Sequence, residues 1–214
     1  MAYQLLSLRP KSIIVKGEQR NTNTDNEHYA KRWRMETLAE VFADPIAVLD
    51  REGVPSDERY NLFYTLSYCG EGKRVFGWQD ILPIDIDGVD TTRLDALESV
   101  VLDLLGVDAS KTAIVASGNG LHILIQMKDK ITSPDYFENW RAQYGALAKR
   151  IDQAMERAKL PGAADKGIFD KGRILRFPGT ENRKIDKKTG MLKIKQCVVR
   201  RSTLEPQAFD LERV

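Results

Sequence analysis

Two apolar segments on either side of a short turn place the strongest constraint on how this chain can fold. Residues 112–116 (TAIVA) and 121–127 (LHILIQM) are rich in aliphatic and β-branched residues, and the sequence SGNG occupies 117–120. Short apolar runs bounded by glycine and polar residues are typical of β-strands. The segment therefore predicts two strands joined by a tight turn, and with them a β-sheet.

The rest of the chain predicts further strands and three helices in an irregular order. We expect strands at 62–68, 81–87, 173–177 and 191–200, helices at 28–43, 91–105 and 133–159, and loops at 16–28, 50–59 and 178–190. Thr91 or Thr92 would cap the second helix at its start and Gly106 at its end, whereas Pro45 would end the first helix. Because strands and helices alternate without a strict βαβ period, the pattern favours an α+β fold, a mixed β-sheet with flanking helices.

The composition of the 214-residue chain fits one compact unit and excludes several classes of protein. Hydrophobic residues make up 42% and charged residues 30%, which excludes an intrinsically disordered chain. Cys69 and Cys197 are too few for a disulfide framework, and with two histidines they form no zinc-binding pattern. No apolar run approaches the ~18 residues of a membrane span. The polar N-terminus lacks a signal peptide, so we expect a cytoplasmic protein that does not contact a membrane.

The net charge of +2 conceals two opposite contributions. Residues 165–201 contain 12 lysines and arginines against 4 acidic residues, a local charge of +8, while the rest of the chain carries −6. A basic strip of this kind suits the phosphate groups of a nucleic acid or a triphosphate. We therefore expect nucleic acid to bind on one side of the protein only.

Asp85 and Asp87, in the sequence ILPIDID, are candidate metal ligands. On a strand the two carboxylates would project from one face about 6.5–7 Å apart, with Ile84 and Ile86 facing the core on the other side. From that spacing both can reach a pair of metal ions, and carboxylate oxygens suit Mg²⁺ or Mn²⁺. The same pattern also fits a polar strand end that enters a turn.

His122 follows the glycine-containing turn directly. Backbone N–H groups of the turn Ser117–Gly120, which lacks bulky side chains, can form an anion-binding concavity. A histidine beside such a turn could hold a triphosphate or donate a proton to it. The alternative is a tight hairpin turn followed by a solvent-facing histidine.

Residues 165–184 (DKGIFDKGRILRFPGTENRK) combine two acids with two arginines. Asp165 and Asp170 precede Arg173 and Arg176, and a planar guanidinium group binds two phosphate oxygens at once. Three residues apart on a strand, the arginines would point to opposite faces, so one of them could be structural. A solvated basic loop is the alternative interpretation.

The order of these features resembles the archaeo-eukaryotic primase superfamily, the catalytic core of primases and primase-polymerases. The family carries a hydrophobic-Asp-x-Asp/Glu motif, a small-x-His motif and a hydrophobic-Asp motif, found here as 84–87, 120–122 and 164–165. Arginines follow the third acid at +8 and +11 in eukaryotic-type members, a spacing that selects Asp165 rather than Asp170. The resemblance covers residues 60–200 and is greatest to phage and plasmid replication primases. It departs at Gly120, where many members have serine.

The resemblance implies roles for individual residues and a division of the chain. Asp85, Asp87 and Asp165 would be catalytic and bind two divalent ions, Mg²⁺ or Mn²⁺. Ser117, Asn119, Gly120, His122, Arg173 and Arg176 would bind the nucleotide, and the basic residues Arg183, Lys184, Lys193 and Lys195 would bind DNA. Residues 61–214 would form the primase-polymerase catalytic core, on which a helical accessory segment, 1–60, would pack.

The implied function is that of a template-dependent nucleotidyltransferase. It would synthesise primers, and extend them on single-stranded DNA, during replication of the phage or plasmid type. Its partners would be the DNA template, ribo- or deoxynucleoside triphosphates and a replicative helicase domain or protein, in the cytoplasm of a bacterial, archaeal or virus-infected cell. The helicase motor would lie elsewhere, because Gly70–Lys73 is too short for a P-loop.

Two other functions are compatible with parts of the sequence. A catalytically silent domain of the same fold could bind DNA or a replication origin, although clustered acids beside phosphate would not help such a protein. A rolling-circle nuclease would need two clustered histidines and a tyrosine nucleophile, and only one histidine lies in any motif.

Overall fold

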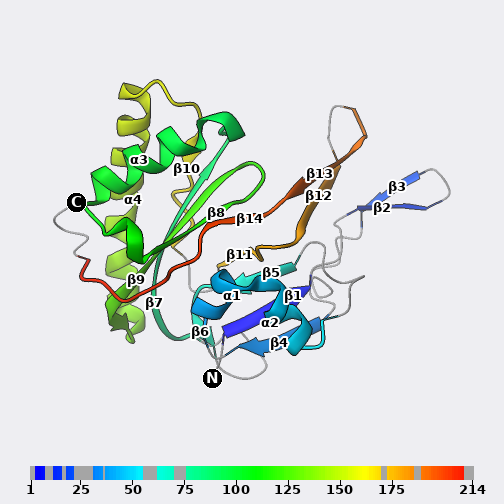
Figure 1. The fold of residues 1–214 in the computed structure, drawn as a ribbon, viewed down its shortest axis with the longest axis horizontal. Helices are drawn as coiled ribbons and strands as arrows, with labels where there is room; N and C mark the ends of the chain where they lie inside the picture. The colour runs from blue at the N-terminus through cyan, green and yellow to red at the C-terminus, as the bar shows by residue number, and fades with distance from the viewer. Residues whose placement is uncertain are drawn as a thin grey trace.

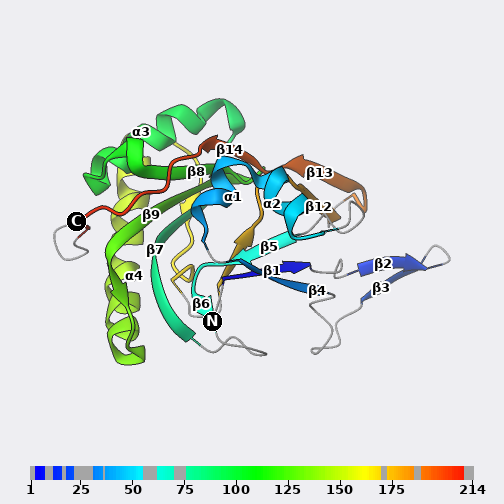
Figure 2. The same ribbon diagram turned by 60° about the horizontal axis from the view of Figure 1, so that its bottom comes forward.

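Two β-sheets, two long helices and two β-ribbons organise the computed structural model of the chain (Figures 1 and 2). The structure describes residues 3–7, 12–15, 18–21, 31–35, 37–54, 62–69, 76–169, 173–185 and 189–209. The larger sheet contains, in spatial order, β10 (Ala163–Ala164), β7 (Phe76–Asp87), β9 (Gly120–Ile131), β8 (Thr112–Ala116) and β14 (Val198–Arg201), and β6 (Tyr68–Cys69) pairs with the start of β7. The predicted mixed architecture of sheet and flanking helices is confirmed.

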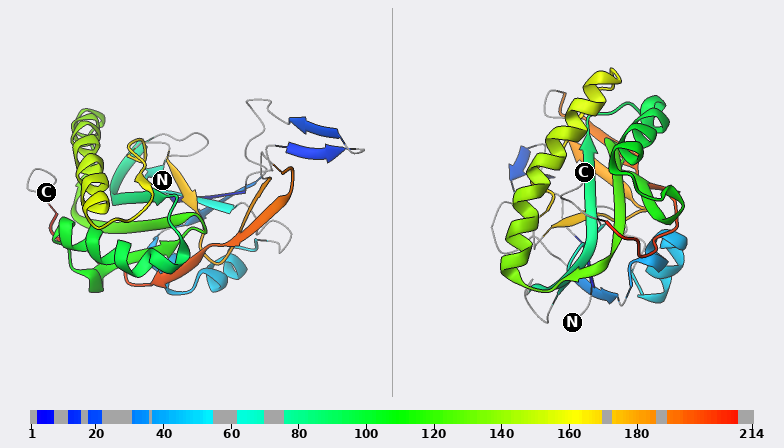
Figure 3. Two further views of the ribbon diagram at one scale, coloured as in Figure 1. Left: turned by 90° about the horizontal axis from the view of Figure 1, so that it is seen from above. Right: turned by 90° about the vertical axis from the view of Figure 1, so that its left-hand side faces the viewer.

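The smaller sheet combines three strands from the N-terminal part of the chain with one strand from much later in the sequence. Its order is β11 (Ile174–Arg176), β5 (Leu62–Thr65), β1 (Tyr3–Ser7) and β4 (Lys31–Met35), and the ribbons are β2 (Ser12–Val15) with β3 (Glu18–Asn21) and β12 (Glu181–Ile185) with β13 (Leu192–Gln196). The helices are α1 (Ala39–Ala43), α2 (Pro45–Arg51), α3 (Leu94–Leu105) and α4 (Pro134–Arg157), with single 3-10 turns at Thr91–Arg93 and Ala109–Lys111. Helices α3 and α4 lie together on one face of the larger sheet (Figure 3). None of the described helices combines the length and apolar character that crossing a membrane would require.

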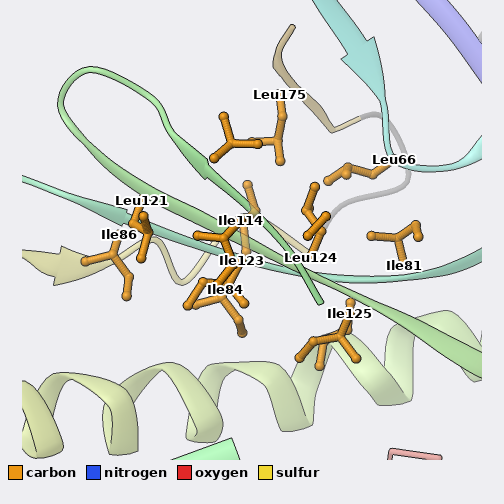
Figure 4. Close-up of a cluster of buried hydrophobic side chains, with 14 of the residues drawn as sticks. Leu66, Ile81, Ile84, Ile86, Ile114, Leu121, Ile123, Leu124, Ile125 and Leu175 are labelled. Atoms are coloured by element: carbon orange, nitrogen blue, oxygen red, sulfur yellow. The ribbon is translucent and has the colours of Figure 1, made fainter. Parts of the chain in front are cut away.

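Alternating side chains place different residues on the two faces of the central strands. Ile84 of β7 pairs with Ile123 of β9, which pairs with Ile114 of β8, and all three are fully buried on the helix-covered face (Figure 4). Because successive side chains of a strand point to opposite faces, Asp85 and His122 project from the other face. The predicted orientation of this strand, with its isoleucines in the core, is confirmed.

The predicted central strands and long helices are confirmed. The strands β8 and β11 and the helices α3 and α4 lie within their expected ranges, whereas β7 begins five residues before its range and β9 ends four residues after its own. The ranges 62–68 and 191–200 contain β5 and β13, and their ends overlap β6 and β14. Gly106 ends α3 with φ 61°, a left-handed conformation that costs glycine little. The predicted threonine caps are wrong, because the side chain of Asp90 caps the segment by accepting a hydrogen bond from the N–H of Thr92 at 2.8 Å.

The predicted helix at 28–43 is wrong at residues 31–35, and its residues 28–30 and 36 lie outside the described part of the structure. Residues Lys31–Met35 form β4, which pairs antiparallel with β1, and helix α1 begins only at Ala39. Pairing with a strand distant in sequence outweighs the helical spacing of the apolar residues. Pro45 does not simply end a helix but starts α2, since the first helical position needs no N–H, and the Asp44 carboxylate accepts a hydrogen bond from Ala47 N at 3.0 Å.

Three predicted loops contain regular structure. Strand β3 lies within 16–28, the end of α2 within 50–59, and β12 within 178–190. Each of these strands belongs to a ribbon, in which the neighbouring strand supplies the backbone hydrogen bonds. Strand β13, the partner of β12, is exposed along its whole length, so no alternation of buried and exposed residues marked the ribbon in the sequence.

The N-terminal segment is not simply helical. Besides α1 and α2 it contains strands β1 to β4, and β1 pairs directly with β5 of the predicted core. Backbone hydrogen bonds therefore run between the two predicted parts, and the division at residue 60 stays a prediction.

A cluster of ion pairs ties the last strand to helix α3. The buried Glu98 of α3 accepts hydrogen bonds from Nε of Arg201 at 2.5 Å and from Nε of Arg200 at 3.4 Å. Arg200 also pairs with Asp95, whose side chain is 93% exposed. The cluster holds β14 in place at the edge of the larger sheet, beside β8.

We expect Glu98→Gln to lower the free energy of unfolding by about 1–3 kcal/mol, because an amide offers one acceptor where two guanidinium groups need two. Asp95→Asn is the matched control, and this exposed pair should contribute less than about 1 kcal/mol. Urea unfolding followed by circular dichroism measures both variants. Equal losses would contradict the assignment of the stabilisation to Glu98.

Candidate functional site

A row of polar residues crosses three neighbouring strands of the larger sheet. Ala164 of β10 pairs with Ile86 of β7, and the next residue, Asp165, donates its N–H to the carbonyl of Asp85 at 2.8 Å. On its other side Asp85 pairs with His122 of β9. Residues that oppose each other across antiparallel strands share a face. The register therefore brings together three predicted site residues from three separate parts of the sequence.

His122 is buried beside Asp85. Its Nε2 lies 3.6 Å from Asp85 Oδ1, and the two side chains are 6% and 13% exposed, so the alternative of a solvent-facing histidine is wrong. Burial, together with the positive charges of Arg176 and Arg173, lowers the pKa of His122 to about 3. The imidazole is therefore neutral near pH 7. It can donate or accept a hydrogen bond but brings no charge to the site, and its Nδ1 has no hydrogen-bond partner among the described residues.

The turn between β8 and β9 is bound tightly to the end of β7. The carbonyl of Asn119 accepts hydrogen bonds from the N–H groups of Gly88 at 2.9 Å and Val89 at 3.2 Å, and Ser117 N donates to the Gly120 carbonyl at 3.0 Å. Asp87, two residues beyond Asp85 on the same face, is exposed at this end of β7. The predicted turn thus lies beside the predicted carboxylates, although 30 or more residues separate them in sequence.

Gly120 has no space for a side chain. A Cβ at this position would lie 1.7 Å from the carbonyl oxygen of Ile86. Serine, which many relatives of the resembled family carry here, could not enter without a shift of the β7–β9 pair. Close packing of the two backbones therefore accounts for a glycine at this position.

Arg173 and Arg176 have different environments. Arg173 forms an ion pair with Asp165, whose Oδ1 also accepts a hydrogen bond from Gly167 N at 2.8 Å. Arg176 is buried, donates from Nη1 to the Glu181 carbonyl at 3.2 Å and lies over the ring of Phe63. Burial lowers the pKa of Arg176 to about 10, so it remains charged at pH 7.

The three carboxylates do not form a closed metal site. Among the described residues, no group of three or more His, Cys, Asp or Glu side chains could hold a metal ion, and Asp165 is paired with Arg173. The three side chains still fit hard divalent cations, because all of them are carboxylates. A backbone hydrogen bond also holds Asp165 next to Asp85. For Asp165 to serve as a ligand, its ion pair with Arg173 would have to open.

The predicted DNA-binding residues lie on the β12–β13 ribbon. Arg183 forms an ion pair with Glu181 at 2.7 Å, Lys193 is exposed, and Lys195 donates to Asn119 Oδ1 at 2.7 Å. The backbone of Lys184 pairs with Lys193 across the ribbon. The side chain of Lys184 and all of Asp170, the alternative third acid, lie outside the described part of the structure.

Sequence reasoning missed three buried polar residues near this site. Asn182 of β12 is 6% exposed, and its Oδ1 has no hydrogen-bond partner among the described residues. Tyr64 and Tyr144 are buried close enough to Asp85 for the negative charge of that carboxylate to raise both tyrosine pKa values, although burial is the larger cause. The only available signal was the PGT-x-N-x-K stretch for Asn182, because the two tyrosines are distant in sequence from every motif.

Comparisons with known proteins find similar solved structures but no match by sequence. No protein-family model matches the sequence, and a search of curated proteins also finds no match. The structure is similar to the primase-polymerase AEP domain of cyanophage S-2L, with a TM-score of 0.44 and 13% identity over 97% of this chain and 84% of that one. It is also similar to the polymerase domain of Mycobacterium tuberculosis Ligase D, solved in complex with DNA, with a TM-score of 0.49 and 13% identity over 99% and 80% of the chains.

We expect Gly120→Ala to lower the free energy of unfolding by about 3 kcal/mol, because the added methyl group collides with the Ile86 carbonyl. Gly145→Ala is the control. A Cβ at this position in α4 meets no atom within 4 Å, so alanine should stabilise the protein by about 0.5–1 kcal/mol through its helix propensity. Thermal unfolding measures both changes. A Gly120→Ala variant as stable as the wild type would contradict the close contact.

The low pKa of His122 predicts a loss of stability in acid. Below pH 6.5 the unfolded chain binds a proton at this imidazole, whereas the folded chain does not until its pKa of about 3. The free energy of unfolding therefore decreases by about 1.4 kcal/mol per pH unit, because of this group, as the pH falls through that interval.

Chemical denaturation at pH 5.5 and 4.5 measures this loss. The His122→Gln variant is the control, because it keeps the other titrating groups. The free energy of unfolding should therefore fall more steeply with decreasing pH in the wild type than in this variant. Equal slopes would show that His122 titrates normally in the folded protein.

Proposed function

We propose that the protein is a nucleotidyltransferase that starts primers and extends them on a single-stranded DNA template. The observation that carries this proposal is the row Asp165–Asp85–His122, with Arg173 at one end and the turn 117–120 beside it. Carboxylates next to phosphate-binding groups are of little use to a protein that only binds DNA. They are what the transfer of a nucleotide from a triphosphate to a hydroxyl group requires.

In the proposed reaction, the 3′-oxygen of the primer attacks the α-phosphorus of the incoming nucleotide. The new P–O bond forms as the bond to the β-phosphate bridging oxygen breaks, pyrophosphate leaves, and the hydroxyl proton passes to solvent. Asp85, Asp87 and Asp165 would hold two divalent cations, Mg²⁺ or Mn²⁺. When bound, such ions lower the pKa of the attacking hydroxyl group and neutralise negative charge on the leaving pyrophosphate.

The other residues would bind and orient the triphosphate. Backbone N–H groups of the turn and the neutral imidazole of His122 offer hydrogen-bond donors, and Arg173 offers a cation that binds two oxygens at once. Arg173 would leave Asp165 for the triphosphate when that carboxylate takes a cation. Arg176, held by the Glu181 carbonyl, would contribute a fixed charge to the same region.

The DNA would lie along the basic ribbon, where Arg183, Lys184, Lys193 and Lys195 would meet phosphate groups. The phage or plasmid setting stays a prediction from the sequence, which leaves the choice between ribo- and deoxynucleotides open.

We expect Asp85→Ala and Asp87→Ala to reduce nucleotide addition by about a thousandfold or more, because each removes charge from the reacting centre. Asp129→Ala is the control, since this exposed acid lies at the far end of β9. The assay is primer synthesis and extension on single-stranded DNA with labelled nucleotides and Mn²⁺.

The same assay compares Asp165→Ala with Asp170→Ala. Only the first should be inactive, and an inactive Asp170→Ala beside an active Asp165→Ala would show that the third acid is misassigned. A wild-type protein that binds DNA yet makes no product would favour a catalytically silent DNA-binding domain instead.

A further inference from the structure

One side-chain contact joins the basic ribbon to the turn of the candidate nucleotide site. Nζ of Lys195 on β13 donates to Oδ1 of Asn119 at 2.7 Å, across 76 positions of sequence. Gly118 makes this approach possible, since it has φ 86° and a Cβ there would lie 2.7 Å from Cβ of Lys195. The ribbon therefore packs against the turn itself (Figure 1).

Asn119 is consequently held from two directions. Its carbonyl accepts hydrogen bonds from the N–H groups of Gly88 and Val89, which directly follow β7, the strand that carries Asp85 and Asp87. Its side chain accepts the ammonium group of Lys195. The first contact positions the backbone of the turn, and the second determines which way the side-chain amide points.

That orientation has a chemical consequence. A side-chain amide has one oxygen that accepts and one NH₂ group that only donates. With Oδ1 turned to Lys195, the NH₂ group is the part of Asn119 that a ligand would meet. The NH₂ group of Asn119 would thus lie beside backbone N–H groups of the turn and the ammonium group of Lys195. These hydrogen-bond donors together suit a ligand that only accepts hydrogen bonds, such as a phosphate.

We infer that Lys195 is a positioning residue for the nucleotide site, which orients the Asn119 amide toward the triphosphate of the incoming nucleotide. This inference rests on the proposed function, in which the turn binds that triphosphate. It differs from the sequence-based role of Lys195 as a DNA contact, because it predicts an effect on nucleotide binding when no DNA is present.

Calorimetric titration with a deoxynucleoside triphosphate and Ca²⁺, without DNA, tests the inference. We expect Lys195→Met to weaken binding about tenfold, the loss typical of one charge-assisted hydrogen bond. Lys195→Arg should keep most of the affinity, because it keeps a charged donor. The matched control is Lys128→Met, which removes an exposed lysine at the far end of β9 and should change the affinity less than twofold.

A double variant separates positioning from direct binding. If Lys195 acts through Asn119, then Asn119→Ala alone should weaken binding about tenfold, and adding Lys195→Met should weaken it by no more than a further factor of two. Asn119→Asp keeps the acceptor for Lys195 but replaces the donor with a negative charge. It should lose triphosphate binding while its melting temperature stays at or above that of the wild type.

The outcomes distinguish a failure of the positioning role of Lys195 from a failure of the proposed function. A wild-type protein that binds no triphosphate would contradict the proposed function. Triphosphate binding that is equal in Lys195→Met and Lys128→Met would overturn the positioning role alone. Additive losses in the double variant, or full binding by Asn119→Asp, would also overturn it, because the Asn119 amide would then not be the group through which Lys195 acts.

Discussion

The antiparallel pairing of β7 with β9 is the interaction on which the rest of the structure depends. Its register places Ile84 opposite Ile123 on the helix-covered face and Asp85 opposite His122 on the other face. A shift by one residue would exchange these faces and bury the carboxylates in the core. Gly120 protects the register at the end of the pair, because only a residue without Cβ can lie so close to the Ile86 carbonyl.

Segments distant in sequence complete the site around this pair. The strand β10 adds Asp165 beside Asp85, the residue before β11 adds Arg173, and the ribbon adds Lys195 at the turn. The resulting electrostatics is asymmetric. Burial and the two arginines keep His122 neutral, so the positive charge that would face a triphosphate comes from arginine and lysine.

The sequence was most informative where one strand or helix has a buried face. The strands β7, β8 and β9 were predictable because they contain short apolar runs bounded by turn residues, and the helices α3 and α4 because their apolar residues follow the helical period. The strands β3, β4 and β12 and the start of α2 were not. In these segments, pairing with another strand or a cap from Asp44 decides the conformation, and no local apolar pattern records it.

The sequence by itself determined the chemistry of the candidate site, namely which acids, which histidine and which arginines, and the order of their motifs. Only the tertiary structure decided their partners. It joined Asp165 to Arg173, buried His122 and brought Lys195 to Asn119. The physical reason is that residue type sets what a group can bind. The group it meets, and the pKa it adopts, depend on strand register and burial, which arise only when distant segments pack together.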